Sequence, residues 1–201
     1  MKDLGDDSTT MEYYQQFPDE FFDSTILADV SELYGHFLKY IPEHGKILDF
    51  GCGSGRDTKE FLDMGYSVEA IDGSSEMCIR ASEYTGIDVK CMDFFDLNEE
   101  SKYDGIWACA SLLHVGRDRL PEIFEVLRKS IAQGGILYAS FKYGDFSGIR
   151  DGRYFDDMNE EILREILSTV KGFDTVEMWQ SQDVRRGKDV DWINVILKRI
   201  S

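Results

Sequence analysis

The chain has 201 residues, 42% of them hydrophobic and 30% charged, which is typical of a single globular domain. Its formal net charge of −17 disfavours nonspecific binding to nucleic acid or to an anionic membrane. The polar, acidic N-terminus carries no apolar signal core, and the longest nearly apolar stretch, residues 105–115, is too short to span a bilayer. We therefore expect a cytoplasmic protein without a membrane or nucleic-acid partner, of undetermined oligomeric state.

Cysteine and histidine usage argues against a metal centre. The four cysteines, Cys52, Cys78, Cys91 and Cys109, form no Cys-x-x-Cys pair, and three histidines complete no zinc spacing. We expect small apolar filler in a reducing compartment, with Cys52 and Cys109 in buried segments.

The N-terminal segment is predicted to be helical after a disordered start. Residues 1–10 are expected to be disordered, and residues 11–40 to carry two helices before Pro42 and Gly45 break the chain. In the second helix, Val30, Leu33, Phe37 and Ile41 recur at helical spacing after Asp29, a plausible N-cap.

The aromatic stretch "MEYYQQFPDEFF" (residues 11–22) allows two interpretations. It is either a lid that closes over a ligand, with Tyr13 or Tyr14 at the mouth of the site, or a helix that packs on the core.

Strands and helices alternate from residue 46 onward. This pattern predicts right-handed crossovers and an α/β fold, a Rossmann-like, doubly wound, mostly parallel sheet. The last two strands have no helix between them, so they should form an antiparallel hairpin at the sheet edge. The expected strands are 46–50, 66–72, 87–93, 103–110, 134–143, 173–184 and 191–200, and the expected helices are 54–65 and 74–86 (ended by Gly65 and Gly86), 117–131 and 157–170.

The first of these strands runs into "DFGCGSG", residues 49–55. A strand-glycine-helix junction places backbone N–H groups beside a ligand. No Gly-Lys-Ser/Thr follows, so a phosphate loop is disfavoured, and the spacing is one residue tighter than the dinucleotide fingerprint Gly-x-Gly-x-x-Gly. Asp49 would repel a pyrophosphate but suits a ligand with a cationic group; alternatively, it caps the N–H groups of the loop.

Acidic residues also follow the next two strands. Asp72 ends the second strand, 17 residues after Gly55, where a carboxylate can accept both ribose hydroxyls; it could instead be the N-cap of the next helix. Asp93 follows the third strand beside Phe94, so the pair can bind the amino group and the ring of an adenine, unless Asp96 takes that role.

Five segments together resemble the class I S-adenosylmethionine-dependent methyltransferases. They are "ILDFGCGSG", "VEAID", "VKCMDFFDL", "YDGIWACASLLHV" and "LRKSIAQGGILYASF", in the order and spacing of that family across residues 46–141. The resemblance implies S-adenosylmethionine as cofactor, S-adenosylhomocysteine as product, and a single methyltransferase domain over 1–201. Within it, residues 11–45 would be a helical lid, 46–141 the cofactor-binding core, and 142–201 the substrate side and closing hairpin.

The resemblance also assigns cofactor contacts. Gly51 and Gly53 would lie against the methionine part, Asp72 would bind ribose, and Ala110 would line the methyl end. Arg56 would meet the cofactor carboxylate or a nearby acid, unless it is a solvated surface residue. The expected cofactor-binding set is Tyr14, Asp49, Gly51, Cys52, Gly53, Arg56, Asp72, Gly73, Ser74, Met77, Asp93, Phe94 and Ala110.

The acceptor side is less defined. The chain is similar to small enzymes of the tellurite-resistance and thiopurine type, which implies methyl transfer to a small molecule, anionic or aromatic. His114 follows the fourth strand and is either a general base or a structural histidine. Basic and aromatic residues gather in residues 141–155 and 179–194, as a substrate pocket or as solvated loop tips. The expected substrate contacts are Tyr143, Arg153, Tyr154, Arg185 and Arg186.

Other functions stay open at this point. The proline-containing boxes of DNA methyltransferases are absent after the fourth strand, and Cys109, expected within that strand, lacks the proline of a base-C5 nucleophile. A cofactor-binding protein without catalysis, a modifier of protein or RNA, and a nicotinamide-dependent oxidoreductase are the alternatives.

Overall fold

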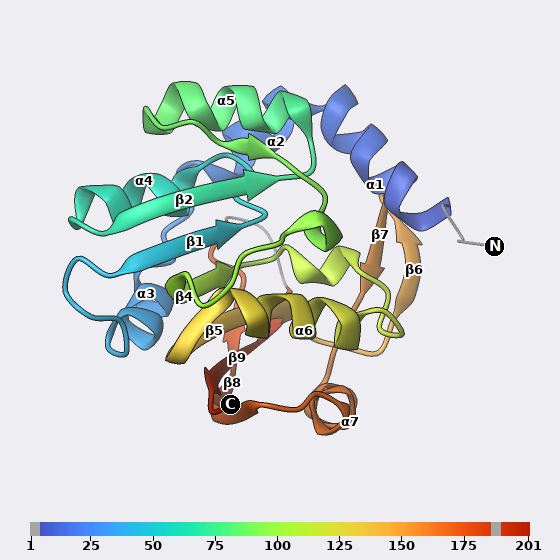
Figure 1. Ribbon diagram of the computed structural model, residues 1–201. Coiled ribbons are helices and arrows are strands. Elements are labelled where there is room, and N and C mark those ends of the chain that lie inside the picture. The colour runs from blue at the N-terminus through green and yellow to red at the C-terminus, as the bar shows by residue number, and fades with distance from the viewer. Residues whose placement is uncertain (1–4, 186–189) are drawn as a thin grey trace.

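A seven-stranded sheet forms the centre of the computed structural model, which describes residues 5–185 and 190–201 (Figure 1). The strand order is β3-β2-β1-β4-β5-β9-β8; the first five are parallel, and β9 and β8 close the edge antiparallel. The Rossmann-like sheet with its antiparallel hairpin is thus confirmed. The strands are β1 (Lys46–Phe50), β2 (Ser67–Asp72), β3 (Lys90–Cys91), β4 (Tyr103–Ala108), β5 (Ile131–Lys142), β8 (Phe173–Gln182) and β9 (Asp191–Arg199).

Helices cover both faces of this sheet. On one face, α3 (Ser31–Leu38), α4 (Arg56–Asp63) and α5 (Ser75–Thr85) pack on β1, β2 and β4. On the other face, α6 (Leu120–Ser130) and α7 (Glu160–Thr169) pack on the strand side chains that point to that side of the sheet. Apolar side chains at helical spacing in the predicted helix 117–131 are fully buried: Leu120, Ile123, Phe124, Leu127 and Ile131, although Ile131 already begins β5.

The local signals for helix ends act as expected. The Ser74 hydroxyl accepts a hydrogen bond from the Met77 N–H, 3.4 Å away, at the start of α5. Gly65 and Gly86 follow α4 and α5 with φ angles of +89° and +80°, a backbone region that favours glycine. Asp29 accepts a hydrogen bond from the Ser31 N–H, but Val30 is the N-cap of α3, one residue later than predicted.

Three helices, rather than two, precede the sheet. The predicted disorder of residues 1–10 is wrong from residue 5, because α1 spans Gly5–Gln16; residues 1–4 lie outside the described ranges. α2 (Pro18–Thr25) begins directly afterwards, since Phe17, before a proline, leaves the helical region (φ −125°, ψ 45°). None of the α2 residues is buried, whereas α3 buries Tyr34 and Phe37 in the core.

A short hairpin that the sequence analysis did not predict stands beside α1 (Figure 1). It consists of β6 (Ser147–Arg150) and β7 (Arg153–Asp156), joined at Asp151 and Gly152, which have φ angles of +51° and +76°. The Tyr154 N–H donates to the Thr10 hydroxyl at 3.0 Å, which ties the hairpin to α1.

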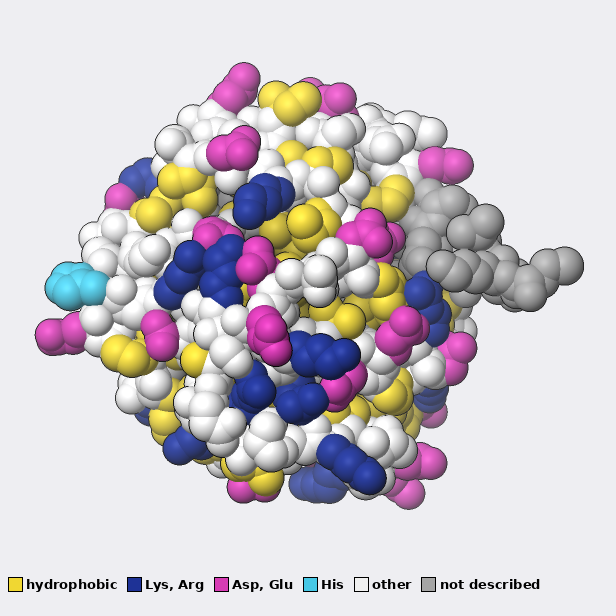
Figure 2. All heavy atoms as spheres, viewed as in Figure 1, with side chains coloured by type: hydrophobic (Ala, Val, Ile, Leu, Met, Phe, Trp, Pro, Cys, Tyr) yellow, Lys and Arg dark blue, Asp and Glu magenta, His cyan; other side chains and the backbone are white. Residues whose placement is uncertain are grey.

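The charged surface is mixed. On the face seen in Figure 2, acidic and basic side chains are interspersed around apolar ones. Over the described ranges, no helix is both long and apolar enough to cross a membrane.

Docking of α3 on the sheet can be tested at Phe37. Its side chain is fully buried, and its ring centroid lies 5.2 Å from that of Trp107. We expect Phe37→Ala to lower the free energy of unfolding by about 3–5 kcal/mol through lost burial and a residual cavity, measured by urea denaturation. Leu27→Ala, at a side chain that is 91% exposed, is the control and should change it by less than about 0.5 kcal/mol. Equal effects of the two substitutions would contradict this packing.

Candidate functional site

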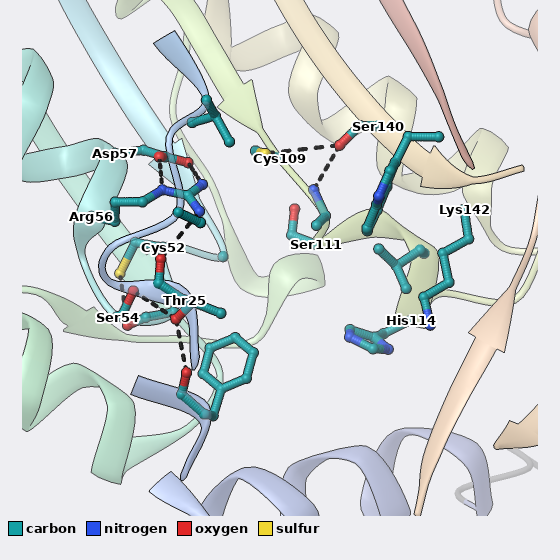
Figure 3. A pocket seen from close by; sticks show the side chains of 18 of the residues that line it. Thr25, Cys52, Ser54, Arg56, Asp57, Cys109, Ser111, His114, Ser140 and Lys142 are labelled. Carbon is teal, nitrogen blue, oxygen red and sulfur yellow. Dashed lines mark hydrogen bonds and ion pairs between the residues drawn. The ribbon is translucent and has the colours of Figure 1, made fainter. Parts of the chain in front are cut away.

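A cavity of about 200 Å³ opens at the carboxyl ends of the parallel strands. The chain runs from β1 outward to β2 and β3, then returns to place β4 on the other side of β1, which is the switch point where α/β sheets bind ligands. The glycine loop, β2, the turn after β4 and α1–α2 form one part of the wall. The ends of β5 and β9, strand β7 and residues 181–185 form the other, and the two parts face each other in Figure 3.

The loop geometry requires its glycines. Gly51, Gly53 and Gly55 have φ angles of +82°, +52° and +78°. A Cβ on Gly51 would lie 2.5 Å from the Cβ of Ser111, so a side chain there would displace the turn after β4. The N–H groups of Gly51 and Cys52 both donate to the Ile71 carbonyl, which joins the loop to β2.

Asp72 connects the same loop to the start of α5. Its Oδ2 accepts from the Gly53 N–H at 2.8 Å, and its Oδ1 accepts from the Ser74 N–H at 2.9 Å. Burial raises the pKa of Asp72, and these backbone donors oppose that rise. Because Ser74 is the N-cap of α5, the alternative role of Asp72 as N-cap is wrong.

A smaller recess adjoins the cavity beyond Asp72. Asp93, Phe94 and Phe95 line it with Met11 and Gly73. The Asp93 carboxylate accepts from the Phe95 N–H at 2.8 Å, and the Phe94 ring stacks on Phe50 with 4.3 Å between centroids. Asp96, the alternative acid, lines neither space.

Arg56 finds an acidic partner next to it in the chain. Its guanidinium donates two hydrogen bonds to Asp57, at 2.6 and 2.9 Å, as Figure 3 shows. The Tyr34 hydroxyl and the Trp107 indole N–H donate to the same carboxylate at 2.6 and 2.8 Å. Although burial opposes it, Arg56 with these donors holds the pKa of Asp57 below its ordinary value.

Asp49 lies behind the loop rather than in the cavity wall. It is 2% exposed, and its Oδ2 accepts from the Thr58 hydroxyl at 2.6 Å. Burial, together with the nearby Asp57, raises the pKa of Asp49. Among the described residues it caps no N–H group of the loop, so that alternative is not met.

The predicted cofactor residues therefore converge on one place. Asp49 and Ser74 lie just behind the wall, and Asp93 lines the recess. The others line the main cavity: Tyr14, Gly51, Cys52, Gly53, Arg56, Asp72, Gly73, Met77, Phe94 and Ala110.

His114 connects α1 to the β6–β7 hairpin. Its Nδ1 lies 2.7 Å from the Tyr154 carbonyl oxygen, which can only accept, so Nδ1 carries the proton. Its Nε2 then accepts from the Tyr14 hydroxyl, 3.0 Å away. Burial lowers the pKa of His114 to about 4, and the nearby Arg153 and Lys142 also disfavour its charged form. The ring is neutral at neutral pH.

Two of the predicted substrate arginines line the cavity. Arg153 reaches it from β7, and Arg185 reaches it while paired with Asp183, whose Oδ1 lies 2.9 Å from the arginine Nε. Arg186 lies outside the described residues.

The predicted substrate tyrosines face elsewhere. The Tyr143 hydroxyl donates to Glu160 at 3.0 Å on the exposed side of the chain, and the buried Tyr154 hydroxyl donates to Asp156 at 3.2 Å. Neither residue is part of the cavity lining. In the alternating pattern of β7, Tyr154 and Arg153 point to opposite sides.

Some residues that line the cavity were not predicted from the sequence. Phe21 of α2 lies over the loop, so that a Cβ on Gly53 would be 3.0 Å from its ring. Ser140 of β5 accepts from the Ala110 N–H at 2.9 Å and so supports a residue with a φ of +52°. A lone serine in the apolar run "ILYASF" was the available signal. Cys109, expected inside a strand, lies one residue beyond β4, is half-buried and lines the cavity.

Fold and site together define a Rossmann-like protein that binds a ligand at the switch point of its sheet. Within the described part of the chain, no three His, Cys, Asp or Glu side chains group to hold a metal ion.

Comparison with known proteins finds similarity to methyltransferases. Residues 47–135 match a family model described as a methyltransferase domain. A relative from Staphylococcus carnosus, described as an uncharacterized methyltransferase, is 23% identical over 94% of this chain and 99% of its own. Magnesium protoporphyrin IX methyltransferase from Synechocystis, solved with bound S-adenosylmethionine, has a similar fold, with a TM-score of 0.75 at 17% identity over 99% of both chains.

A second solved structure is similar over most of the chain. It is the 1,6-didemethyltoxoflavin-N1-methyltransferase of Burkholderia thailandensis, with S-adenosylhomocysteine bound; the TM-score is 0.71 at 22% identity, over 94% of this chain and 85% of that one. Residues 47–135 of this chain are thus similar to a methyltransferase domain, and the chain shares the fold of these two solved methyltransferases. These two solved structures hold S-adenosylmethionine or S-adenosylhomocysteine, and the glycine cradle of this chain, with its buried Asp72, fits such a ligand.

The neutral state of His114 predicts an acid-linked loss of stability. The unfolded chain takes up a proton near pH 6.5, but the folded chain takes it up only near pH 4. The free energy of unfolding should therefore decrease as the pH falls from 6.5 to 4, by roughly 3 kcal/mol from this residue. His114→Gln lacks this titration, so its urea stability should fall less over the same range. Parallel pH profiles of the two proteins would contradict the assignment.

Proposed function

We propose that this protein transfers a methyl group from S-adenosylmethionine to a small-molecule acceptor that is anionic or aromatic. The observation that carries the proposal is the continuity of the cavity. Its wall begins at the glycine loop and Asp72 and ends at the basic and aromatic side chains of Lys142, Arg153 and Trp192. We further propose one domain for the whole chain, with residues 46–141 as its cofactor-binding core.

The cofactor half follows from the contacts of the loop. Gly51 and Gly53 allow close approach of the methionine part, and Asp72 accepts the ribose hydroxyls. Its two oxygens already accept two N–H groups, but a carboxylate has about four acceptor positions, so two remain. The adenine is proposed to lie near Met77, between Phe94 and the exposed carboxylate of Asp93.

Enclosure favours a small acceptor over protein or RNA. Tyr14 and Phe21 bring α1 and α2 over the cavity, and their rings are in edge contact at 4.8 Å. We propose that these helices form the lid, which excludes water and holds the acceptor in line. The two structural neighbours described above are named for small acceptors, 1,6-didemethyltoxoflavin and magnesium protoporphyrin IX.

Methyl transfer from a sulfonium requires alignment of the acceptor more than catalytic side chains. Bound S-adenosylmethionine supplies the reactive methyl group, and the protein aligns the acceptor lone pair with it. His114 fits a positioning role better than that of a general base, because both of its nitrogens have partners and a pKa of about 4 gives little tendency to hold a proton.

The ribose assignment predicts the effect of one substitution. Asp72→Ala removes the proposed charged hydrogen bonds and should weaken S-adenosylhomocysteine binding by roughly 2 kcal/mol or more, measured by calorimetric titration. Asp96→Ala removes an exposed acid outside the cavity and should leave the affinity unchanged. A dissociation constant for Asp72→Ala within twofold of wild type would overturn the assignment.

Activity is tested directly with labelled cofactor. The protein is incubated with methyl-labelled S-adenosylmethionine and fractions of a metabolite extract, a protein fraction and RNA as separate acceptors. We expect label in the low-molecular-mass fraction only. Tight cofactor binding without transfer to any fraction would favour a binding protein, and label in protein or RNA would refute a small acceptor.

A further inference from the structure

Lys142 ends β5 inside the cavity wall, and no acidic residue in the described part of the chain forms an ion pair with it. Its side chain is half-buried and extends toward His114 (Figure 3). The ammonium lies 3.8 Å from the centroid of the Phe155 ring, and it makes no hydrogen bond or ion pair with any described residue. Burial, followed by repulsion from Arg150 and Arg153, lowers the pKa of Lys142 to about 8.

Arg153 approaches the same place from β7 and likewise forms no ion pair with an acidic residue of 5–185 or 190–201. Its Nε is buried and has no hydrogen-bond partner among the described residues. One terminal nitrogen lies 3.5 Å from the Tyr14 hydroxyl, a long contact, and the guanidinium stands over the rings of Tyr13 and Phe155 at 4.4 and 5.1 Å. Ring contacts stabilise the cation but do not neutralise its charge.

Neighbouring cations, in contrast, are neutralised. Arg150 binds Asp157 through two hydrogen bonds of 2.9 and 3.1 Å, and Arg185 binds Asp183. The chain has 39 acidic and 22 basic residues, so the unpaired state of these two cations does not result from a shortage of acidic residues. A partly desolvated cation without a counter-charge costs free energy, and an anionic ligand would remove that cost.

Apolar surface flanks these two cations. Phe155 lies between them, and Trp192 of β9 pairs with Lys142 across the β5–β9 ladder. Both rings line the cavity. The site therefore combines two free positive charges with flat apolar walls, the combination that recognises an acid carried by a ring.

We propose that Lys142 and Arg153 form an oxyanion subsite that binds a carboxylate or phosphate group of the methyl acceptor, while Phe155 and Trp192 contact its apolar body. That the bound molecule is the methyl acceptor rests on the proposed function, whereas the anion subsite itself does not. The acceptor is then a small organic acid, ring-bearing and apolar apart from its anionic group, and the two cations position it toward the cofactor end of the cavity.

The subsite is tested first without any reaction. The wild-type protein is labelled with trace acetic anhydride at pH 8, and acetylation of Lys142 is measured by peptide mass spectrometry relative to the exposed Lys198 in the same digest. Benzoate and phenyl phosphate are the anionic probes, benzamide is the neutral analogue, and sodium chloride matches the ionic strength.

We expect at least one anion to lower the Lys142-to-Lys198 ratio several-fold, with little effect of benzamide or chloride. Protection by benzoate indicates a carboxylate acceptor, and protection by phenyl phosphate alone indicates a phosphate acceptor. Arg153→Met should abolish the protection. A ratio that neither anion changes, or that benzamide lowers equally, overturns the proposal.

A kinetic test follows with the acceptor found in the metabolite screen. Lys142→Met and Arg153→Met should each raise KM for that acceptor by about tenfold or more, because a charged hydrogen bond is lost, and leave cofactor affinity within twofold. Lys198→Met is the matched control and should change neither value. An unchanged KM in both cavity variants overturns the subsite. Absence of any transfer contradicts the proposed function alone, since the labelling experiment needs no reaction.

Discussion

The buried carboxylate of Asp57 is the interaction on which the site depends. It sits in the first turn of α4, accepts from Arg56, Tyr34 and Trp107, and so joins α4, α3 and β4 directly beneath the glycine loop. An acid at a helix N-terminus is favourable, and these donors satisfy a charge that would otherwise be costly to bury. Removing one partner of such a pair costs about 3–5 kcal/mol, so the position of the loop is strongly determined.

The two ends of the cavity are built differently. The proposed cofactor end is largely backbone: the Gly51 and Cys52 N–H groups donate to the Ile71 carbonyl, and the Gly53 N–H donates to the buried carboxylate of Asp72. The acceptor end consists of side chains from β5, β7 and β9, which come from the last third of the chain. The proposed function fits this division, because backbone geometry persists through substitutions that alter a side-chain pocket.

Sequence patterns predicted the part of the structure that local rules determine. The signals that predicted the core are local in sequence. They are the spacing of the loop glycines, the helix-ending Gly65 and Gly86, and the periodic apolar residues. The β6–β7 hairpin did not, because two charged four-residue strands have almost no pattern of their own and are stabilised by α1. Sequence patterns also do not reveal which side chains are buried or which residues far apart in the chain are in contact. Tyr154 and Arg153 are adjacent in sequence, yet only the structure shows which of them faces the cavity.

The proposed anion subsite lies in a protein whose net negative charge should repel an anion. The net charge of −17 repels an organic acid, but at physiological ionic strength surface charges act over a Debye length of only about 8 Å. Lys142 and Arg153 lie in the cavity wall with Phe155 and Trp192, where the lower dielectric weakens screening and strengthens their local attraction. Recognition of the acid then occurs at short range inside the cavity, and the acidic surface slows its arrival without cancelling its binding. The surface charge can thus serve solubility while two unpaired cations determine the acceptor.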